Sequence, residues 1–232
     1  MTQITASEVA KLRKITGAGM MDCKQALTES NGDFDGAFEF LRKKGQKIAV
    51  KREDRDAKEG CVLSGITADA KNACIVAVNC ETDFVAKNED FIAFTQSVLS
   101  VALAEKPASA DALKALKIGN DTIADLLTDQ MGKIGEKIDL GCYETISAEQ
   151  CFAYIHPGNR LATIVGLNQT GVDNQVGRNV AMQIAAMNPI SVCKEDCPTE
   201  VVEKEIEIGK EQAINEGKPA EMAEKIAVGK LN

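Results

Sequence analysis

The side chains best suited to nucleophilic or metal chemistry in this chain are eight cysteines and one histidine, His156. A catalytic thiol needs a neighbouring base, and a zinc site needs closely spaced ligands. No two cysteines stand at CxxC spacing, and the closest pair is Cys193 and Cys197. His156 lies in YIHPGN, where proline and glycine favour a turn. We therefore predict no catalytic residue and no metal site, and a thiol enzyme that uses His156 is the weakest of three functional hypotheses.

Composition narrows the classes of function further. The glycine patterns GxxxxGK[ST] and GxGxxG, whose backbone amides bind phosphates, are both absent, so we expect no cofactor. With 35 acidic and 27 basic residues the net charge is −8, which disfavours nucleic acid as a partner. The longest apolar run, ACIVAV, is too short to cross a membrane, and the first residues lack the pattern of a secretion signal. A cytoplasmic protein with reduced, mostly buried thiols is expected.

One stretch, CETDFVAKNEDF, places two bulky apolar side chains, Phe84 and Val85, among charged residues. The apolar run before it predicts a strand that ends at Asn79, and the next helix is expected to start near Ala86. The pair would then lie in a connection, and connections lie at the surface. Two interpretations are open. Either Phe84 folds back onto the core, with Asp83 capping the helix, or Phe84 is presented to another protein.

The residues before this stretch predict three short helices with apolar residues at helical spacing. Helix ends are expected at Gly17, Gly32 and Gly45, because glycine readily adopts the left-handed conformation that follows a helix. Residues 1–50 would form a three-helix bundle. Residues 51–59 are almost wholly charged, which predicts a solvated linker or the exposed surface of a helix.

Beyond the linker, short apolar runs separated by turns predict an α+β core of antiparallel strands and helices. Residues 60–137 combine two strands with an apolar helix and two shorter helices, and residues 138–192 repeat the order of strands followed by a helix. We interpret this order as a duplicated sheet-plus-helix core. Residues 193–232 predict two helices joined at a Gly-Lys-Pro turn, as in a protruding helical hairpin.

Two segments carry a family resemblance. NCETDFVAKNEDF closely resembles a signature of elongation factor Ts, the guanine-nucleotide exchange factor for elongation factor Tu in translation. Residues 12–45, which read LRKITGAGMMDCKQALTESNGDFDGAFEFLRKKG, resemble the other signature of that family. The resemblance implies an N-terminal domain of the ubiquitin-associated (UBA) type and a core of two similar subdomains with a helical protrusion. It also implies nucleotide exchange without covalent chemistry.

The same resemblance assigns residues to the partner. It implies that the TDFV turn enters the guanine-nucleotide domain of elongation factor Tu near its magnesium site and promotes GDP release. The turn consists of Thr82, Asp83, Phe84 and Val85. Three residues of the bundle are candidates for contact with the same domain, namely Leu12, Met20 and Met21, and His156 is the candidate for contact with another domain.

The second hypothesis is a UBA-type adaptor that tethers other proteins and has no exchange activity. Both hypotheses use the bundle, but only the exchange factor gives the TDFV turn a function. Longer members of the family continue beyond the position of Leu231, so weaker binding to elongation factor Tu than that of a full-length relative is expected. Family precedent leaves room for a homodimer or a two-by-two complex.

Overall fold

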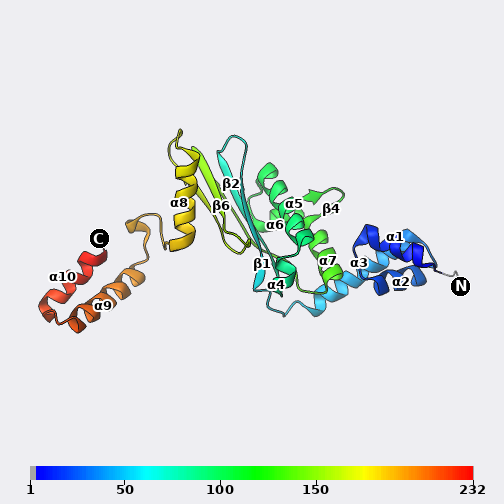
Figure 1. The fold of residues 1–232 in the computed structure, drawn as a ribbon, viewed down its shortest axis with the longest axis horizontal. Coiled ribbons are helices and arrows are strands. Elements are labelled where there is room, and N and C mark those ends of the chain that lie inside the picture. The colour runs from blue at the N-terminus through cyan, green and yellow to red at the C-terminus, as the bar shows by residue number, and fades with distance from the viewer. Residues whose placement is uncertain (1–3, 232) are drawn as a thin grey trace. The chain divides into compact units, whose positions relative to one another are not determined.

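The computed structural model describes residues 4–231, which divide into two compact units on either side of the Ala186–Met187 bond. Helices and small antiparallel sheets make up the first unit, and helices make up the second (Figure 1). This arrangement confirms the predicted α+β class. Among residues 4–231, no helix is both long enough and apolar enough to cross a membrane.

The first three helices pack around a small apolar core. They are α1 (Ala6–Thr16), α2 (Met20–Glu29) and α3 (Phe34–Lys51). Thr5 begins α1 with a capping box, and Gly17 ends it with a φ of 68°, a left-handed conformation that costs glycine little. The buried core is formed by Val9, Leu12, Ala18, Cys23, Ala26, Leu27 and Ala37. The three predicted helices are present, and the assignment to the UBA type stays a prediction.

The predicted end of the third helix at Gly45 is wrong, because α3 continues to Lys51. Gly45 is buried where α3 crosses α7 (Ile123–Ile134). A Cβ atom added to Gly132 of α7 would lie only 2.9 Å from the Cα atom of Gly45. Gly45 therefore permits a close approach of two helices. A glycine in this role and a glycine that ends a helix look the same in the sequence.

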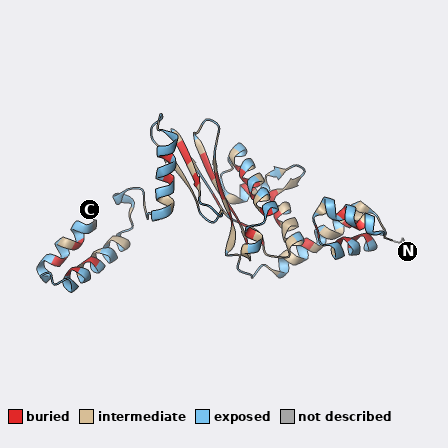
Figure 2. Ribbon diagram, in the orientation of Figure 1, coloured by how far each residue is buried: buried red, intermediate tan, exposed pale blue. Residues whose placement is uncertain are grey.

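A three-stranded antiparallel sheet forms the centre of the first unit. It contains β1 (Glu59–Ile66), β2 (Asn72–Cys80) and β5 (Asp139–Ser147), in the order β1-β2-β5. The apolar helix α5 (Glu89–Glu105) packs on β1 and β2, and the buried residues gather between them (Figure 2). The two strands and the helix predicted for residues 60–103 are thus present.

A second sheet covers the other face of the first. It consists of β6 (Gln150–Ile155) and β7 (Ala162–Leu167), paired antiparallel. Adjacent residues of a strand point to opposite faces, and Ser64 donates a hydrogen bond to the Tyr154 carbonyl of β6, while Gly65 lies against Leu99 of α5. The middle strand β2 is therefore covered on both sides, and most of its residues are buried.

The remaining elements of the first unit are short. The helix α6 (Ala110–Ala115) precedes a hairpin of β3 (Lys117–Ile118) and β4 (Asp121–Thr122), which leads into α7. The sequence analysis missed this hairpin, because two strands of two residues leave no measurable alternation. The helix α8 (Asn174–Met187) begins after β7.

The duplicated core stays a prediction. Residues 138–192 do contain three strands and a helix, as expected. However, β5, the first of these strands, pairs with β2 of the preceding segment and not with β6. Strand order alone does not reveal which neighbour a strand will choose, because pairing is decided by packing between elements that are distant in sequence.

The second unit contains a helical hairpin. After a 3₁₀ turn at Lys194–Asp196, α9 (Thr199–Asn215) and α10 (Ala220–Leu231) pack against each other. Small buried residues allow their close contact, namely Gly209, Ala213, Ala223 and Ala227. The two helices and the turn between them agree with the sequence analysis, and a protruding role stays a prediction.

Candidate partner-binding site

The TDFV turn places one large apolar side chain in solvent. Its residues lie in and just before α4 (Asp83–Ala86), a one-turn helix between β2 and α5. The side chain of Phe84 is 84% exposed, so the interpretation that it folds back onto the core is wrong. Val85 packs against the main core and is half-buried. Of the predicted apolar pair, Phe84 therefore lies at the surface, and Val85 attaches α4 to the core.

The boundaries around the turn also differ from those expected. β2 continues to Cys80, and the long helix α5 begins at Glu89, not near Ala86. Asn88 caps α5 by accepting hydrogen bonds from two backbone amides. The separate helix α4 was not expected, because four residues are too few to show helical periodicity.

Thr82 is held by a carboxylate from a distant part of the chain. Its backbone amide donates to Oε2 of Glu136 at 3.0 Å, and its hydroxyl donates to Oε1 at 2.7 Å. The amide of Glu81 also donates to Oε2 of Glu136, at 3.0 Å. Glu136 follows α7 and is 54 residues away from Thr82 in the sequence. This residue fixes the backbone that enters α4.

Glu81 forms the reverse connection. Its Oε1 accepts from the backbone amide of Lys137 at 2.6 Å, and Arg52 and Arg55 form ion pairs with the same carboxylate. Burial alone would raise the pKa of Glu81, but the Lys137 amide and the two arginines together hold it below its ordinary value. Within the predicted charged linker 51–59, Arg52 and Arg55 bind the residue that precedes the turn, and the Arg55 side chain stays 61% exposed.

Asp83 is the first residue of α4 and does not cap the helix. Thr82 occupies the capping position, and Asp83 forms an ion pair with Lys87 at 2.6 Å. That partner, with a smaller contribution from Arg160, lowers the pKa of Asp83. Arg160 belongs to the turn between β6 and β7 and also binds Glu59 at 2.8 Å. Because Glu59 pairs with Cys80 on the neighbouring strand, the β6–β7 turn and the TDFV turn lie at the same end of the sheet.

His156 lies in that β6–β7 turn, as its sequence setting predicted. It is exposed, and its Nδ1 is 2.9 Å from the Tyr154 hydroxyl. Its backbone amide donates to the Leu161 carbonyl and closes the turn. The structure thus brings His156 and the TDFV turn to the same end of the first unit, because Arg160 binds Glu59, which pairs with Cys80 just before the turn.

The three candidate residues of the bundle are placed differently. Met20 and Met21 begin α2 and are 58% and 72% exposed, so both are accessible to a partner. Leu12 has no exposed surface and is part of the bundle core. The prediction that Leu12 contacts the partner does not agree with this burial. The spacing of Leu12 in α1 fits a core position as well as a contact position, and the sequence pattern does not distinguish the two.

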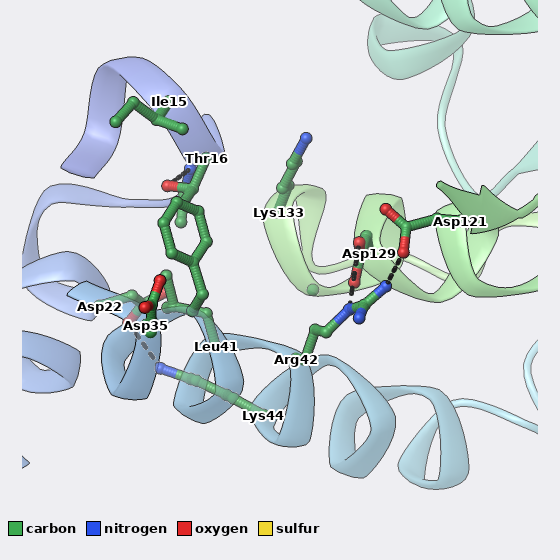
Figure 3. Close-up of a pocket in the computed structure, with 13 residues that line it drawn as sticks. Ile15, Thr16, Asp22, Asp35, Leu41, Arg42, Lys44, Asp121, Asp129 and Lys133 are labelled. Atoms are coloured by element: carbon green, nitrogen blue, oxygen red, sulfur yellow. Dashed lines mark hydrogen bonds and ion pairs between the residues drawn. The ribbon is translucent and has the colours of Figure 1, made fainter. Parts of the chain in front are cut away.

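A cavity of about 410 Å³ lies between the bundle and α7 (Figure 3). Arg42 of α3 reaches across it to Asp121 and comes within 3.9 Å of Asp129. Burial raises the pKa of Asp129, and the charge of Arg42 opposes that effect. Figure 3 shows these groups facing one another between the two helices. The ion pairs attach the bundle to the core, and the TDFV residues do not line this cavity.

The thiols lack the surroundings of a nucleophile. All eight cysteines are free, five are buried, and only Cys193 is exposed. Burial, together with the nearby charge of Glu136, raises the pKa of Cys80 to about 11. The Cys80 thiol donates to the carbonyl of Thr82 at 3.2 Å, so it supports the backbone of the turn. Within residues 4–231, no three acidic, cysteine or histidine side chains are grouped to hold a metal ion.

Alkylation should follow this difference in burial. With iodoacetamide at pH 8, we expect Cys193 to react first and Cys80 to stay unmodified until the chain unfolds, because only the thiolate reacts and burial keeps Cys80 protonated. Mass mapping of the modified peptides measures both rates. The same treatment in urea is the control and should label all eight cysteines. Early labelling of Cys80 in the folded protein would contradict the burial described above.

The residues that hold the turn were not predicted from the sequence. Glu136 binds Thr82 and Arg52 binds Glu81, each from a different connection of the chain. The charges of residues 51–59 indicated only a linker or an exposed helix surface. A charged residue just after a predicted helix gives no local signal of its partner, because such contacts depend on the tertiary fold.

Comparison with known proteins identifies the family of this chain. The sequence profile of the family described as Elongation factor TS matches residues 81–232. The chain is 51% identical to an elongation factor Ts of Porphyromonas gingivalis over 230 residues, covering 98% of this chain and 82% of the relative. It is 52% identical to that of Amoebophilus asiaticus, covering 99% and 83%, and 49% identical to that of Cytophaga hutchinsonii, covering 100% and 84%. These matches include the exposed TDFV turn and nearly all of the chain, which therefore belongs to the elongation factor Ts family.

Proposed function

We propose that this chain promotes release of GDP from elongation factor Tu by inserting Phe84 beside the magnesium and nucleotide site of that partner. The family acts in translation elongation, and elongation factor Tu is the partner that membership implies. One observation carries the proposal. A phenylalanine that is 84% exposed lies on a short helix, and the Glu136 carboxylate binds the backbone of the two residues before that helix. Exposed aromatic residues on rigid supports are typical anchors of protein interfaces.

The mechanism is a coupling between two ligands of one partner. A magnesium ion that bridges the phosphates supplies much of the affinity for a nucleotide, so displacing its surroundings weakens GDP binding. If the exchange factor binds nucleotide-free elongation factor Tu more tightly than the GDP form, GDP must weaken the binding of the exchange factor by the same factor. The direction of exchange is then set by the concentrations of GDP and GTP.

Charged and polar groups around Phe84 fit a supporting role. Thr82 and Asp83 directly precede Phe84 in the sequence, and Val85 packs the helix against the core. We further propose that the exposed Met20 and Met21 contact the same guanine-nucleotide domain and that His156 contacts another domain. The bundle and the β6–β7 turn would thus enlarge an interface centred on Phe84. A homodimer or a two-by-two complex is compatible with this proposal.

The proposed exchange forms and breaks no covalent bond. The residue types that could act as nucleophiles are mostly buried thiols, and the histidine is engaged with Tyr154. This supports a role in which binding free energy, and not acid–base chemistry, accelerates the reaction.

A GDP-release assay tests the function. Elongation factor Tu is loaded with a fluorescent GDP derivative and mixed with excess unlabelled GDP and small amounts of this chain. We expect release to accelerate in proportion to the concentration of the chain and then to saturate, because each molecule acts repeatedly. A UBA-type adaptor would bind and leave the release rate unchanged, and that result would reject the exchange function.

A further inference from the structure

The helix that carries Phe84 cannot be stable by itself. α4 has four residues, and its capping residue Thr82 makes no side-chain hydrogen bond to the helix. Isolated helices of this length do not form in water, because ordering the backbone of the first turn costs more free energy than its few hydrogen bonds contribute. The orientation of Phe84 must therefore come from groups outside the helix.

Glu136 supplies the largest set of such contacts. Its carboxylate accepts three hydrogen bonds from the two residues before α4, from the amides of Glu81 and Thr82 and from the Thr82 hydroxyl. Hydrogen bonds to a charged acceptor are about twice as strong as neutral ones. Because all three donors belong to the segment that turns out of β2, the carboxylate fixes where α4 begins.

The connection is reciprocal. Glu136 binds the backbone before α4, and Glu81 accepts from the backbone amide of Lys137, the residue after Glu136. Each of the two connections thus provides a carboxylate for the backbone of the other. Arg52 holds the Glu81 side chain with an ion pair. Such a closed arrangement leaves little freedom for the backbone on which Phe84 is carried.

We propose that Glu136 is a positioning residue for nucleotide exchange, acting through the orientation of Phe84. This inference rests on the proposed function. A side chain that must enter a neighbouring protein contributes most when it is already ordered, because the cost of ordering then does not reduce the binding free energy. Glu136 orders Phe84 before binding, and it does not itself need to contact elongation factor Tu.

The chemistry of the site distinguishes three substitutions. Glu136→Ala removes every acceptor, and release should slow roughly tenfold. Glu136→Gln keeps one oxygen for the two amides, and its amide group can donate to the Thr82 hydroxyl, which can accept as well as donate. The glutamine variant should therefore retain most of the activity. Glu136→Asp keeps the charge but is one methylene too short to satisfy all three donors, so its rate should fall between the other two.

A double-mutant cycle separates positioning from a general loss of stability. Release rates are measured for the parent, Glu136→Ala, Phe84→Ala and the double variant, with melting temperatures recorded for each. If Glu136 acts through Phe84, the double variant is no slower than Phe84→Ala alone. Glu149→Ala is the matched control, because Glu149 is an exposed glutamate in the turn between β5 and β6. With this variant, elongation factor Tu should release GDP at the rate seen with the parent.

Each outcome decides a different claim. If Phe84→Ala is as fast as the parent, the proposed function is wrong. If Phe84→Ala is slow but Glu136→Ala is not, or if the two losses multiply in the double variant, only the positioning role is wrong. Should Glu136→Ala fail to fold, Glu136→Asp takes its place in the cycle with the same expectation, and losses that multiply would again overturn the inference.

Discussion

Replacing Phe84 with alanine is expected to slow the catalysed release of GDP roughly 10- to 100-fold while leaving the chain folded. Complete burial of a phenylalanine side chain stabilises an interface by about 1.5–3 kcal/mol, and the coupling proposed here would lose that contribution. The fold should not change, because an 84% exposed ring makes few contacts within its own chain. Surface substitutions of this kind usually alter stability by less than about 0.5 kcal/mol.

The measurement compares release rates and melting temperatures for the parent and the variant. Ile66→Ala is a suitable control, since Ile66 is also an exposed apolar residue of the first unit, 42% exposed. It pairs with Ala73 at one end of the β1–β2 hairpin, whereas Cys80 and the TDFV turn lie at the other end. The control should accelerate GDP release from elongation factor Tu as much as the parent does. A Phe84→Ala protein that matches the parent would show that the aromatic ring is not the exchanging group.

Local patterns were sufficient for much of the fold. A capping box, a left-handed glycine and regular apolar spacing each depend on neighbours within a few residues, and these located α1, α2, α9 and α10. The strands β1, β2, β6 and β7 were predictable for a similar reason, because apolar runs bounded by turns are a local property. The place of Phe84 in a connection was also predictable, but that place left open whether its ring folds back onto the core or is presented to another protein.

Contacts between distant residues were not predictable. Glu136 binds Thr82 from 54 residues away, and Arg52 binds Glu81 from 29 residues away, so neither pair leaves a pattern within one element. Gly45 shows the same limit in another form, because its small size serves contact with α7 and not the end of α3. The residues that present Phe84 were therefore hidden, although Phe84 itself was not.

Leu12 illustrates how one helical pattern can support either a core or an interface role, and a substitution separates the two. Leu12→Ala should destabilise the bundle by about 2–5 kcal/mol, because a fully buried leucine is removed and a cavity remains. A bundle with so small a core has little stability in reserve, so the loss should be enough to unfold it or bring it near unfolding. Phenylalanines such as Phe34 and Phe38 pack against this core, and a closely packed core collapses only partly around a deleted side chain.

Met21→Ala is the matched comparison, because Met21 is 72% exposed and belongs to the same bundle. It should leave stability within about 0.5 kcal/mol of the parent and weaken binding to elongation factor Tu. Urea unfolding followed by circular dichroism, together with limited proteolysis of residues 4–51, measures the first effect, and titration of elongation factor Tu measures the second. If Leu12→Ala were as stable as the parent but bound poorly, Leu12 would be a contact residue after all, and the bundle would have to expose it on meeting its partner.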